Sequence, residues 1–106
     1  MKAVVQRVAS ASVSVDGEVV SSIGRGLCVL VGIHRDDTRQ QMEHVARKLA
    51  ALRVFDDEAS GKRLNKSVRD VGLEILCVSQ FTLYHVMKGN KLDFHLAMGG
   101  DKAKDF

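Results

Sequence analysis

The seven residues 27–33 (Leu-Cys-Val-Leu-Val-Gly-Ile) form the longest continuous apolar run in the chain. The run has the length of a strand, and no polar residue interrupts it. A strand of this kind needs cover on both of its faces, as the central strands of layered α/β proteins have. We therefore predict a central strand here, and the rest of the chain must supply the layers that cover it.

One amphipathic helix is predicted directly after this run. Thr38 and Gln41 have the S/T-x-x-E/Q spacing of a capping box, and Asp36 and Asp37 place negative charge where a helix N-terminus favours it. The apolar face has helical spacing and consists of Met42, Val45, Ala46, Leu49 and Leu52. Basic residues crowd the C-terminal end of the helix at Arg47, Lys48 and Arg53.

A β-hairpin is predicted before the central strand. Residues 13–15 alternate between apolar and polar with period two, as a half-buried strand does. Asp16 and Gly17 are the residue types that a type I′ hairpin turn requires. Residues 18–23 are then expected to form the returning strand.

The second half of the chain predicts shorter elements. Residues 54–55 and 73–78 are expected to be strands, the second of them buried, and residues 88–91 a turn. Residues 94–98 could begin a helix, and residues 101–106 resemble the first turn of another. The predicted fold class is α/β, with mixed β-sheet layers and a helix packed on one face, in a single domain over residues 1–106.

The cellular setting is inferred from the apolar segments and the cysteines. No apolar stretch approaches the ~18 residues that span a bilayer, and Gln6 and Arg7 interrupt the N-terminal segment before a signal-peptide core could form. The expected location is cytoplasmic, with the nucleus as an alternative. Cys28 and Cys77 each lie inside an apolar run, so we expect two free, buried thiols.

The net charge of +3 is unevenly distributed. Residues 1–60 carry eight basic and eight acidic residues, whereas residues 61–106 carry eight and five. The excess is densest at Lys62, Arg63, Lys66 and Arg69, and returns at Lys88 and Lys91. Such a face suits a polyanion such as RNA, although charge alone favours an ordinary solvated surface.

Familiar catalytic constellations are scarce. The four histidines and two cysteines do not have metal-ligand spacing, so neither a metal site nor a cofactor is predicted. Ser79 and Thr82 are the hydroxyls placed just after a buried strand, and His85 could act as their base. Without further information an ordinary structural role for both hydroxyls is favoured, because a nucleophile needs a base within hydrogen-bond reach.

Several segments together resemble the D-aminoacyl-tRNA deacylase family, in its eukaryotic branch. They are residues 1–8 (Met-Lys-Ala-Val-Val-Gln-Arg-Val), 52–58, 65–68, 79–83 (Ser-Gln-Phe-Thr-Leu) and 88–91 (Lys-Gly-Asn-Lys). They occur in collinear order over about residues 1–98. The Ser-Gln-Phe-Thr-Leu segment is the most specific of them.

The resemblance implies an activity and a site. The family hydrolyses the ester that joins a D-amino acid to the terminal adenosine of tRNA, removes glycine mischarged on tRNA-Ala, and forms homodimers with active sites at the interface. Ser79, Gln80, Phe81 and Thr82 would line the pocket. Thr82 matches a threonine once proposed as nucleophile, whereas RNA-assisted chemistry through the substrate's own 2′-hydroxyl would leave positioning to the protein.

The expected roles within this site follow from that second chemistry. The backbone amides of Phe81 and Thr82 would stabilise the oxyanion, and Gln80 would orient the substrate. Arg7 would hold the pocket wall or the interface. The turn residues Lys88, Gly89, Asn90 and Lys91 would bind the substrate tRNA.

The sequence departs from the family pattern in two places. The family selects chirality with a Gly-Pro pair in cis near its C-terminus, but this chain contains no proline, and Leu92 stands where proline usually follows Lys-Gly-Asn-Lys. We therefore expect a domain incomplete at its C-terminus, with C-terminal strands missing, and a chain that is inactive or no longer selective for D-esters. The alternatives are a non-catalytic module that binds DNA or tRNA, or an inert subunit that dimerises with full-length chains.

Overall fold

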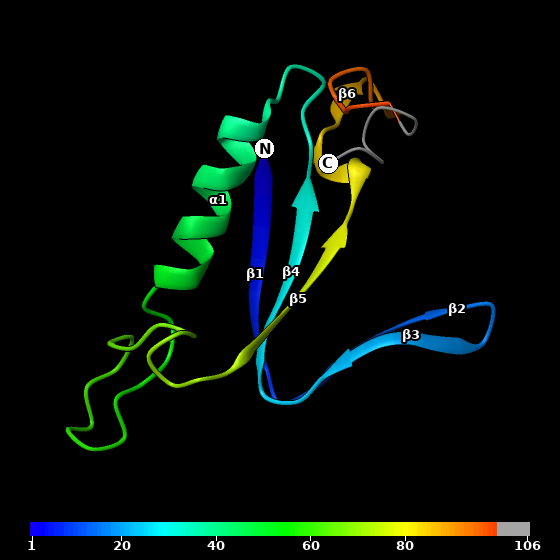
Figure 1. Cartoon of the computed structure of the whole chain (residues 1–106). Coiled ribbons are helices and arrows are strands. Elements are labelled where there is room, and N and C mark those ends of the chain that lie inside the picture. The colour runs from blue at the N-terminus through cyan, green and yellow to red at the C-terminus, as the bar shows by residue number, and fades with distance from the viewer. Residues whose placement is uncertain (100–106) are drawn as a thin grey trace.

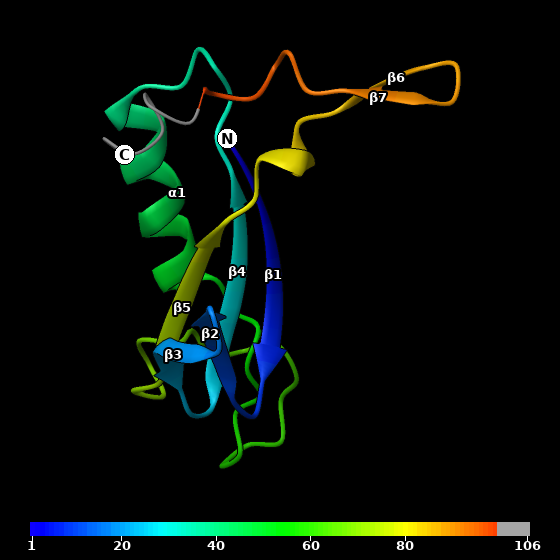
Figure 2. The same cartoon turned by 90° about the vertical axis from the view of Figure 1, so that its right-hand side faces the viewer.

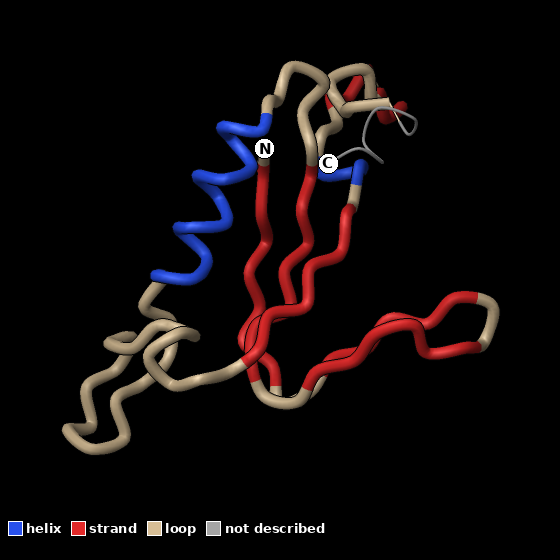
Figure 3. The backbone as a smooth tube through the Cα atoms, in the orientation of Figure 1, coloured by secondary structure: helices blue, strands red, loops and turns tan. Residues whose placement is uncertain are grey.

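The computed structural model describes residues 1–99 and places a single helix against a small mixed sheet. The elements are β1 (Lys2–Val8), β2 (Ala11–Val15), β3 (Glu18–Ile23), β4 (Gly26–Gly32), α1 (Arg39–Ala51), β5 (Glu74–Ser79), the 3₁₀ helix η1 (Phe81–Leu83), β6 (Val86–Lys88) and β7 (Lys91–Asp93). Figures 1 and 3 show α1 along one side of the sheet and two hairpins leaving its opposite ends. The predicted fold class is confirmed.

The central sheet has the order β1-β4-β5. β1 pairs with β4 antiparallel and β5 pairs with β4 parallel, so β4 is the middle strand, as its apolar run predicts. A parallel neighbour requires a crossover connection, and residues 33–73, which include α1, supply it. β1 and β5 are both edges within the described part of the chain.

The core lies between the sheet and α1. Leu27 and Val29 of β4 are fully buried, as is Phe55 from the crossover, and Leu49 of α1 packs with them. On the other face of β4, Cys28 and Leu30 are only half-buried. The prediction of a strand covered on both faces is therefore right for the face toward α1 and too strong for the opposite face.

The helix begins where the capping box predicts. Thr38 is its N-cap, and the backbone N–H of Thr38 donates to Oε1 of Gln41 at 2.8 Å. The helix ends at Ala51, so Leu52, expected on its apolar face, instead follows the last turn and is 40% exposed. Its backbone is extended there, because Leu52 leads into the segment that inserts Phe55 into the core.

The predicted hairpin of β2 and β3 is confirmed. Asp16 and Gly17 have positive φ angles of 51° and 82°, the conformation that a type I′ turn needs at both central positions. Figure 1 shows this hairpin projecting away from α1 at the end of the sheet. Because it leaves the core, Val15, Val19 and Val20 are more than half exposed.

Two predictions in the second half of the chain are wrong. Residues 94–98 do not begin a helix: the backbone of Ala97 makes an antiparallel bridge with His34, and the N–H of Met98 bonds to the carbonyl of Ile33 at 2.8 Å. Pairing with the segment after β4 satisfies these backbone groups in place of a helix. Cys77 is free as predicted but exposed, because β5 is an edge strand.

The remaining short elements are partly as expected. Residues 54–55 give only a single bridge, between Phe55 and Lys66, in place of a strand. The turn predicted at residues 88–91 joins β6 to β7, and Gly89 adopts a φ of 62° there. The helix predicted over residues 101–106 lies outside the described residues.

Candidate functional site

The segment after β5 turns sharply at the end of the sheet. The N–H of Gln80 continues the parallel ladder by donating to the carbonyl of Val31 at 2.7 Å. The chain then forms η1, in which the N–H of Leu83 donates to the carbonyl of Gln80 at 3.3 Å. Ser79, Gln80, Phe81 and Thr82 are thereby brought into one turn anchored on β4.

Two side chains of this turn are joined to each other. Nε2 of Gln80 donates to the hydroxyl of Thr82 at 2.5 Å, and both residues are half-buried. Ser79 is exposed. The group that contacts the Thr82 hydroxyl is therefore an amide N–H donor. An amide cannot take a proton from a hydroxyl at neutral pH.

Among the described residues, no hydrogen bond joins His85 to the hydroxyl of Thr82. Its Nδ1 lies 2.9 Å from the carbonyl oxygen of Thr82, so the ring nitrogen donates there. With Nδ1 donating, Nε2 is the ring nitrogen left to accept a proton, and in the described part of the chain it makes no hydrogen bond with the Thr82 hydroxyl. The arrangement therefore favours positioning over nucleophilic catalysis by Thr82.

Backbone amides at the start of η1 are the candidate donors for an oxyanion. The first N–H groups of a helix have no carbonyl partner within the helix. The N–H groups of Phe81 and Thr82 precede that of Leu83, which makes the first bond of this turn. Donors fixed in this way can stabilise developing negative charge without rearrangement.

Tyr84 closes the turn and is buried, with 8% of its surface exposed. Its ring meets the ring of His34 edge-on, with centroids 5.1 Å apart, and Nζ of Lys2 lies 4.8 Å from the Tyr84 centroid. The same ammonium donates to the carbonyl of Leu83 at 3.3 Å. Burial, with a further contribution from Asp37, raises the pKa of Tyr84 above its ordinary value.

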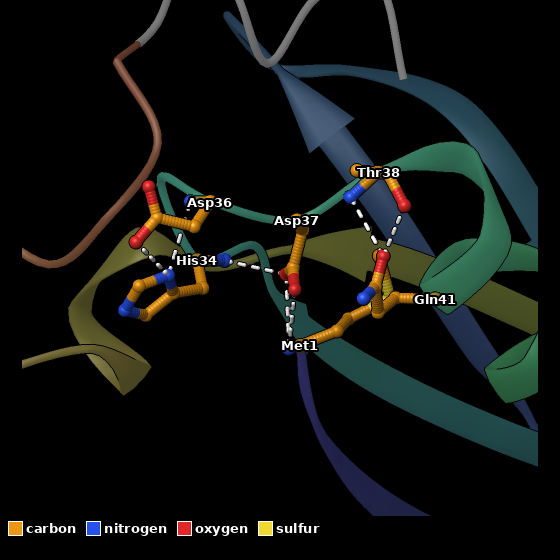
Figure 4. Close-up of polar contacts among 6 residues, drawn as sticks. All are labelled: Met1, His34, Asp36, Asp37, Thr38 and Gln41. Atoms are coloured by element: carbon orange, nitrogen blue, oxygen red, sulfur yellow. Dashed lines mark hydrogen bonds and ion pairs between the residues drawn. The ribbon is translucent and has the colours of Figure 1, made fainter.

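The start of α1 lies in the same region, and Figure 4 shows its polar contacts. Asp37 accepts from the N-terminal amine of Met1 at 3.0 Å and from the N–H of His34 at 2.7 Å. Asp37 was expected to act through the helix dipole, but it instead joins the start of β1 to the end of β4. Sequence reasoning missed this pair, since nothing in residue spacing connects positions 1 and 37.

An apolar groove of about 460 Å³ runs between α1 and the edge of β5. Its lining includes Met42, Val45 and Leu49 from the helix and Cys77, Val78 and Ser79 from the strand. The first residue of the candidate turn, Ser79, thus borders a hollow large enough for a small apolar group.

The other predicted binding residues lie apart from this turn. Arg7 pairs with Leu27, whereas Ser79 pairs with Val31, which separates the two by about 13 Å at about 3.3 Å per residue. Arg7 donates instead to the carbonyl of Val54 at 3.0 Å and lies 3.7 Å from Asp56. The structure therefore does not bring Arg7 to the turn of its own chain.

The turn at residues 88–91 lies at the tip of the β6–β7 hairpin, which Figure 2 shows extending away from the sheet. Lys88, Gly89, Asn90 and Lys91 are all exposed. Nζ of Lys88 lies 2.9 Å from Asp93. Lys88, followed by the backbone and ring of His95, holds the pKa of Asp93 well below its usual range.

The basic stretch at residues 62–69 lies among carboxylates. Hydrogen bonds from Ser60 lower the pKa of Asp57 and those from Ser67 lower the pKa of Asp70, and the charge of Lys66 contributes to both. Arg25 pairs with Glu58 at 3.6 Å in the same region. Lys66 of the basic stretch thus acts electrostatically on two carboxylates.

Two other features are absent from the described residues. Within residues 1–99, no three His, Cys, Asp or Glu side chains gather as they would around a metal ion. The described helices include none with the length and apolarity to cross a membrane.

The fold is shared with two solved structures. A solved structure described as c-Myc DNA Unwinding Element Binding Protein is 62% identical and superposes with a TM-score of 0.92 over 99% of this chain and 70% of its own. A second, solved as "Structural Analysis of a probable eukaryotic D-amino acid tRNA deacylase", is 22% identical with a TM-score of 0.75, which supports the fold alone.

The family model described as D-Tyr-tRNA(Tyr) deacylase matches residues 4–106, and the chain belongs to this family. It is 62% identical to D-aminoacyl-tRNA deacylase 1 of Homo sapiens over all of this chain and 50% of that protein. It is 59% identical to D-aminoacyl-tRNA deacylase of Drosophila melanogaster, covering 65% of that protein. The chain thus spans about half the length of the vertebrate relatives, and the predicted family is confirmed.

Proposed function

We propose that this chain hydrolyses the ester of D-aminoacyl-tRNA, and of glycyl-tRNA mischarged on tRNA-Ala, releasing the amino acid and the tRNA. The observation that carries the proposal is the family membership together with the Ser79–Thr82 turn at the open end of the sheet. Relatives named for this activity are 59–62% identical to the chain over the 105–106 aligned residues. Activity of the 106-residue chain itself is part of the proposal, since those relatives are longer.

In the proposed mechanism the protein positions the ester and stabilises charge. The amides of Phe81 and Thr82 would receive the developing oxyanion, where one donor is typically worth ~3 kcal/mol. Gln80, held by its bond to Thr82, would keep the turn in register with the substrate. The 2′-hydroxyl of the terminal adenosine would assist the attack of water on the ester carbonyl, and the bond to the ribose 3′ oxygen would break as the amino acid leaves. This agrees with the absence of a base on either hydroxyl among the described residues.

The proposed contacts to tRNA lie away from the ester. Lys88 and Lys91, at the tip of the β6–β7 hairpin, would meet phosphates, with Gly89 and Asn90 shaping the turn. Arg7 would serve at the interface of a homodimer, because it lies too far along β1 to reach the turn of its own chain. The proposed setting is translation proofreading in the cytoplasm.

The test is hydrolysis of matched D- and L-tyrosyl-tRNA by the 106-residue chain. We expect cleavage of the D-ester with weak discrimination against the L-ester, because the chain has no proline to form the family's chirality-selecting pair. Glycyl-tRNA-Ala serves as the achiral comparison. Binding of tRNA without hydrolysis of any of the three esters would contradict the proposal and favour a non-catalytic nucleic-acid-binding module.

A further inference from the structure

Gly32 occupies the last position of β4, directly beneath the candidate turn. It is buried, and it stands opposite Lys2 in the ladder between β1 and β4. Its neighbour Val31 pairs with Ser79 and accepts the N–H of Gln80. Gly32 is therefore the point on the middle strand over which the chain passes as it leaves β5.

The turn uses the space that a side chain would fill at this position. A Cβ built on Gly32 would lie 2.8 Å from Cβ of Leu83 and 3.2 Å from Cδ2 of Tyr84. Carbon atoms in good contact are about 3.5–4.0 Å apart. Any residue larger than glycine would have to push η1 outward by roughly 1 Å, the difference between those distances.

Lys2 and His34 also contact the turn and the tyrosine that follows it. Lys2 donates to the carbonyl of Leu83 at 3.3 Å, and its ammonium lies over the ring of Tyr84. His34 packs edge-on against the same ring. Contacts from β1 and from the end of β4 thus keep the turn pressed into the space above Gly32.

We propose that Gly32 is a positioning residue for the deacylation reaction, whose missing side chain sets the height of the Gln80–Thr82 amides above the sheet. The inference rests on the proposed function, because it assigns Gly32 an effect on that reaction through Leu83 and Tyr84. Gly32 does not touch the substrate.

Two other glycines allow this role to be separated from a general effect on the fold. A Cβ on Gly26, at the far end of β4, would overlap the backbone of Glu74, so Gly26→Ala damages the sheet without touching the turn. Gly24 has nothing within 4 Å of its added Cβ and no positive φ, so Gly24→Ala is the matched neutral change.

Tyr84 provides a spectroscopic signal for the turn, because it is the single tyrosine and the chain has no tryptophan. The experiment compares the wild-type chain with Gly32→Ala, Gly24→Ala and Gly26→Ala. Each is measured by alkaline titration of tyrosine absorbance and by single-turnover deacylation of D-tyrosyl-tRNA over a range of protein concentrations. A fourth variant, Gly32→Ala with Leu83→Gly, removes the Leu83 side chain that the added methyl group would meet.

We expect Gly32→Ala to lower the tyrosine midpoint toward its ordinary value as the ring loses burial. The deacylation rate at saturation should fall about 100-fold, the usual cost of a displacement near 1 Å, with little change in half-saturation. Gly24→Ala should match the wild type in both measurements. Gly26→Ala should lower the melting temperature and leave the tyrosine midpoint unchanged, and the double variant should recover the rate.

An unchanged tyrosine midpoint and an unchanged rate in folded Gly32→Ala would overturn the inference, as would a double variant that folds and recovers neither. If Gly32→Ala does not fold, the tyrosine midpoint and the deacylation rate of the double variant test the inference in its place. A wild-type chain that cleaves no ester would instead refute the proposed function. The tyrosine titrations would then show separately whether Gly32 sets the height of the turn.

Discussion

Replacing Thr82 by valine distinguishes a positioning hydroxyl from a nucleophile. Valine has nearly the shape of threonine, so the change removes the hydroxyl and little else. In the structure that hydroxyl accepts one hydrogen bond, from Nε2 of Gln80 at 2.5 Å, and His85 contacts the carbonyl of Thr82 in place of the hydroxyl. The substitution therefore removes one neutral hydrogen bond.

The expected magnitude is small. A neutral hydrogen bond contributes about 1 kcal/mol net, which corresponds to about fivefold in rate. Removing the nucleophile of an enzyme that depends on one costs about 10⁶-fold, as in subtilisin. The two explanations of Thr82 thus differ by several orders of magnitude in the expected rate.

The assay is single-turnover hydrolysis of D-tyrosyl-tRNA with the protein in excess, which isolates the chemical step from product release. Gln80→Ala is the companion variant because it removes the other end of the same bond. If the bond is what matters, the double variant should be no slower than the slower single variant. A loss above about 10⁴-fold in Thr82→Val, with an unchanged melting temperature, would refute the positioning mechanism and identify Thr82 as the nucleophile.

Three further outcomes concern stability and pH. Phe55→Ala should lower the free energy of unfolding in urea by about 3–5 kcal/mol, because the ring is fully buried. The control, Val20→Ala on the exposed hairpin, should lower it by less than about 0.5 kcal/mol. Equal effects of the two changes would contradict the assigned core. In the chain that begins at Met1, Asp37→Asn should cost about 3 kcal/mol, because the carboxylate and the amine that it pairs with are both buried. Asp36→Asn, at a side chain 78% exposed, is the matched control and should cost little. The pKa of Asp93 lies below its ordinary 3.8, so its carboxylate stabilises the β6–β7 hairpin above about pH 4 and loses this effect as the pH falls toward the folded-state value. A carboxyl-carbon titration by NMR with a midpoint at the ordinary value would disprove that local arrangement.

Local features of the sequence predicted the elements that depend on neighbouring residues. The capping box of Thr38 and Gln41 and the Asp16-Gly17 turn are each complete within a few residues, and both are present in the structure. The uninterrupted apolar run likewise identified β4 as the middle strand. The capping box and the turn contain the interactions that form, whereas the apolar run predicted only that the strand would be covered.

Features that depend on distant partners were not predictable in the same way. Residues 94–98 have an apolar pattern that a helix would accept, but pairing with the segment after β4 satisfies their backbone first. Cys77 lies in an apolar run and is nonetheless exposed, because the run does not reveal which strand has only one neighbour. Knowledge of the strand order would have corrected both predictions.

In the candidate site, too, the local segment was predicted and the contacts from distant residues were not. The segment from Ser79 to Thr82 was identified by its resemblance to the family's Ser-Gln-Phe-Thr-Leu segment, and the structure places these residues in one turn. The supports from Lys2, Gly32 and Tyr84 were missed, because each comes from a different part of the chain. The glycine in the middle of an apolar run was the one available signal, since such a glycine often marks a close approach of backbone.

The parallel pairing of β4 with β5 has a consequence for how the site is acquired during folding. The carbonyl of Val31 and the N–H of Gln80 are separated by the whole crossover, and contacts between such distant positions are slow to form. α1, whose capping contacts are local, can form much earlier. In a refolding experiment, helical circular dichroism should therefore return before the candidate turn forms, and a chain arrested between those two events would contain its helix but lack the Ser79–Thr82 turn.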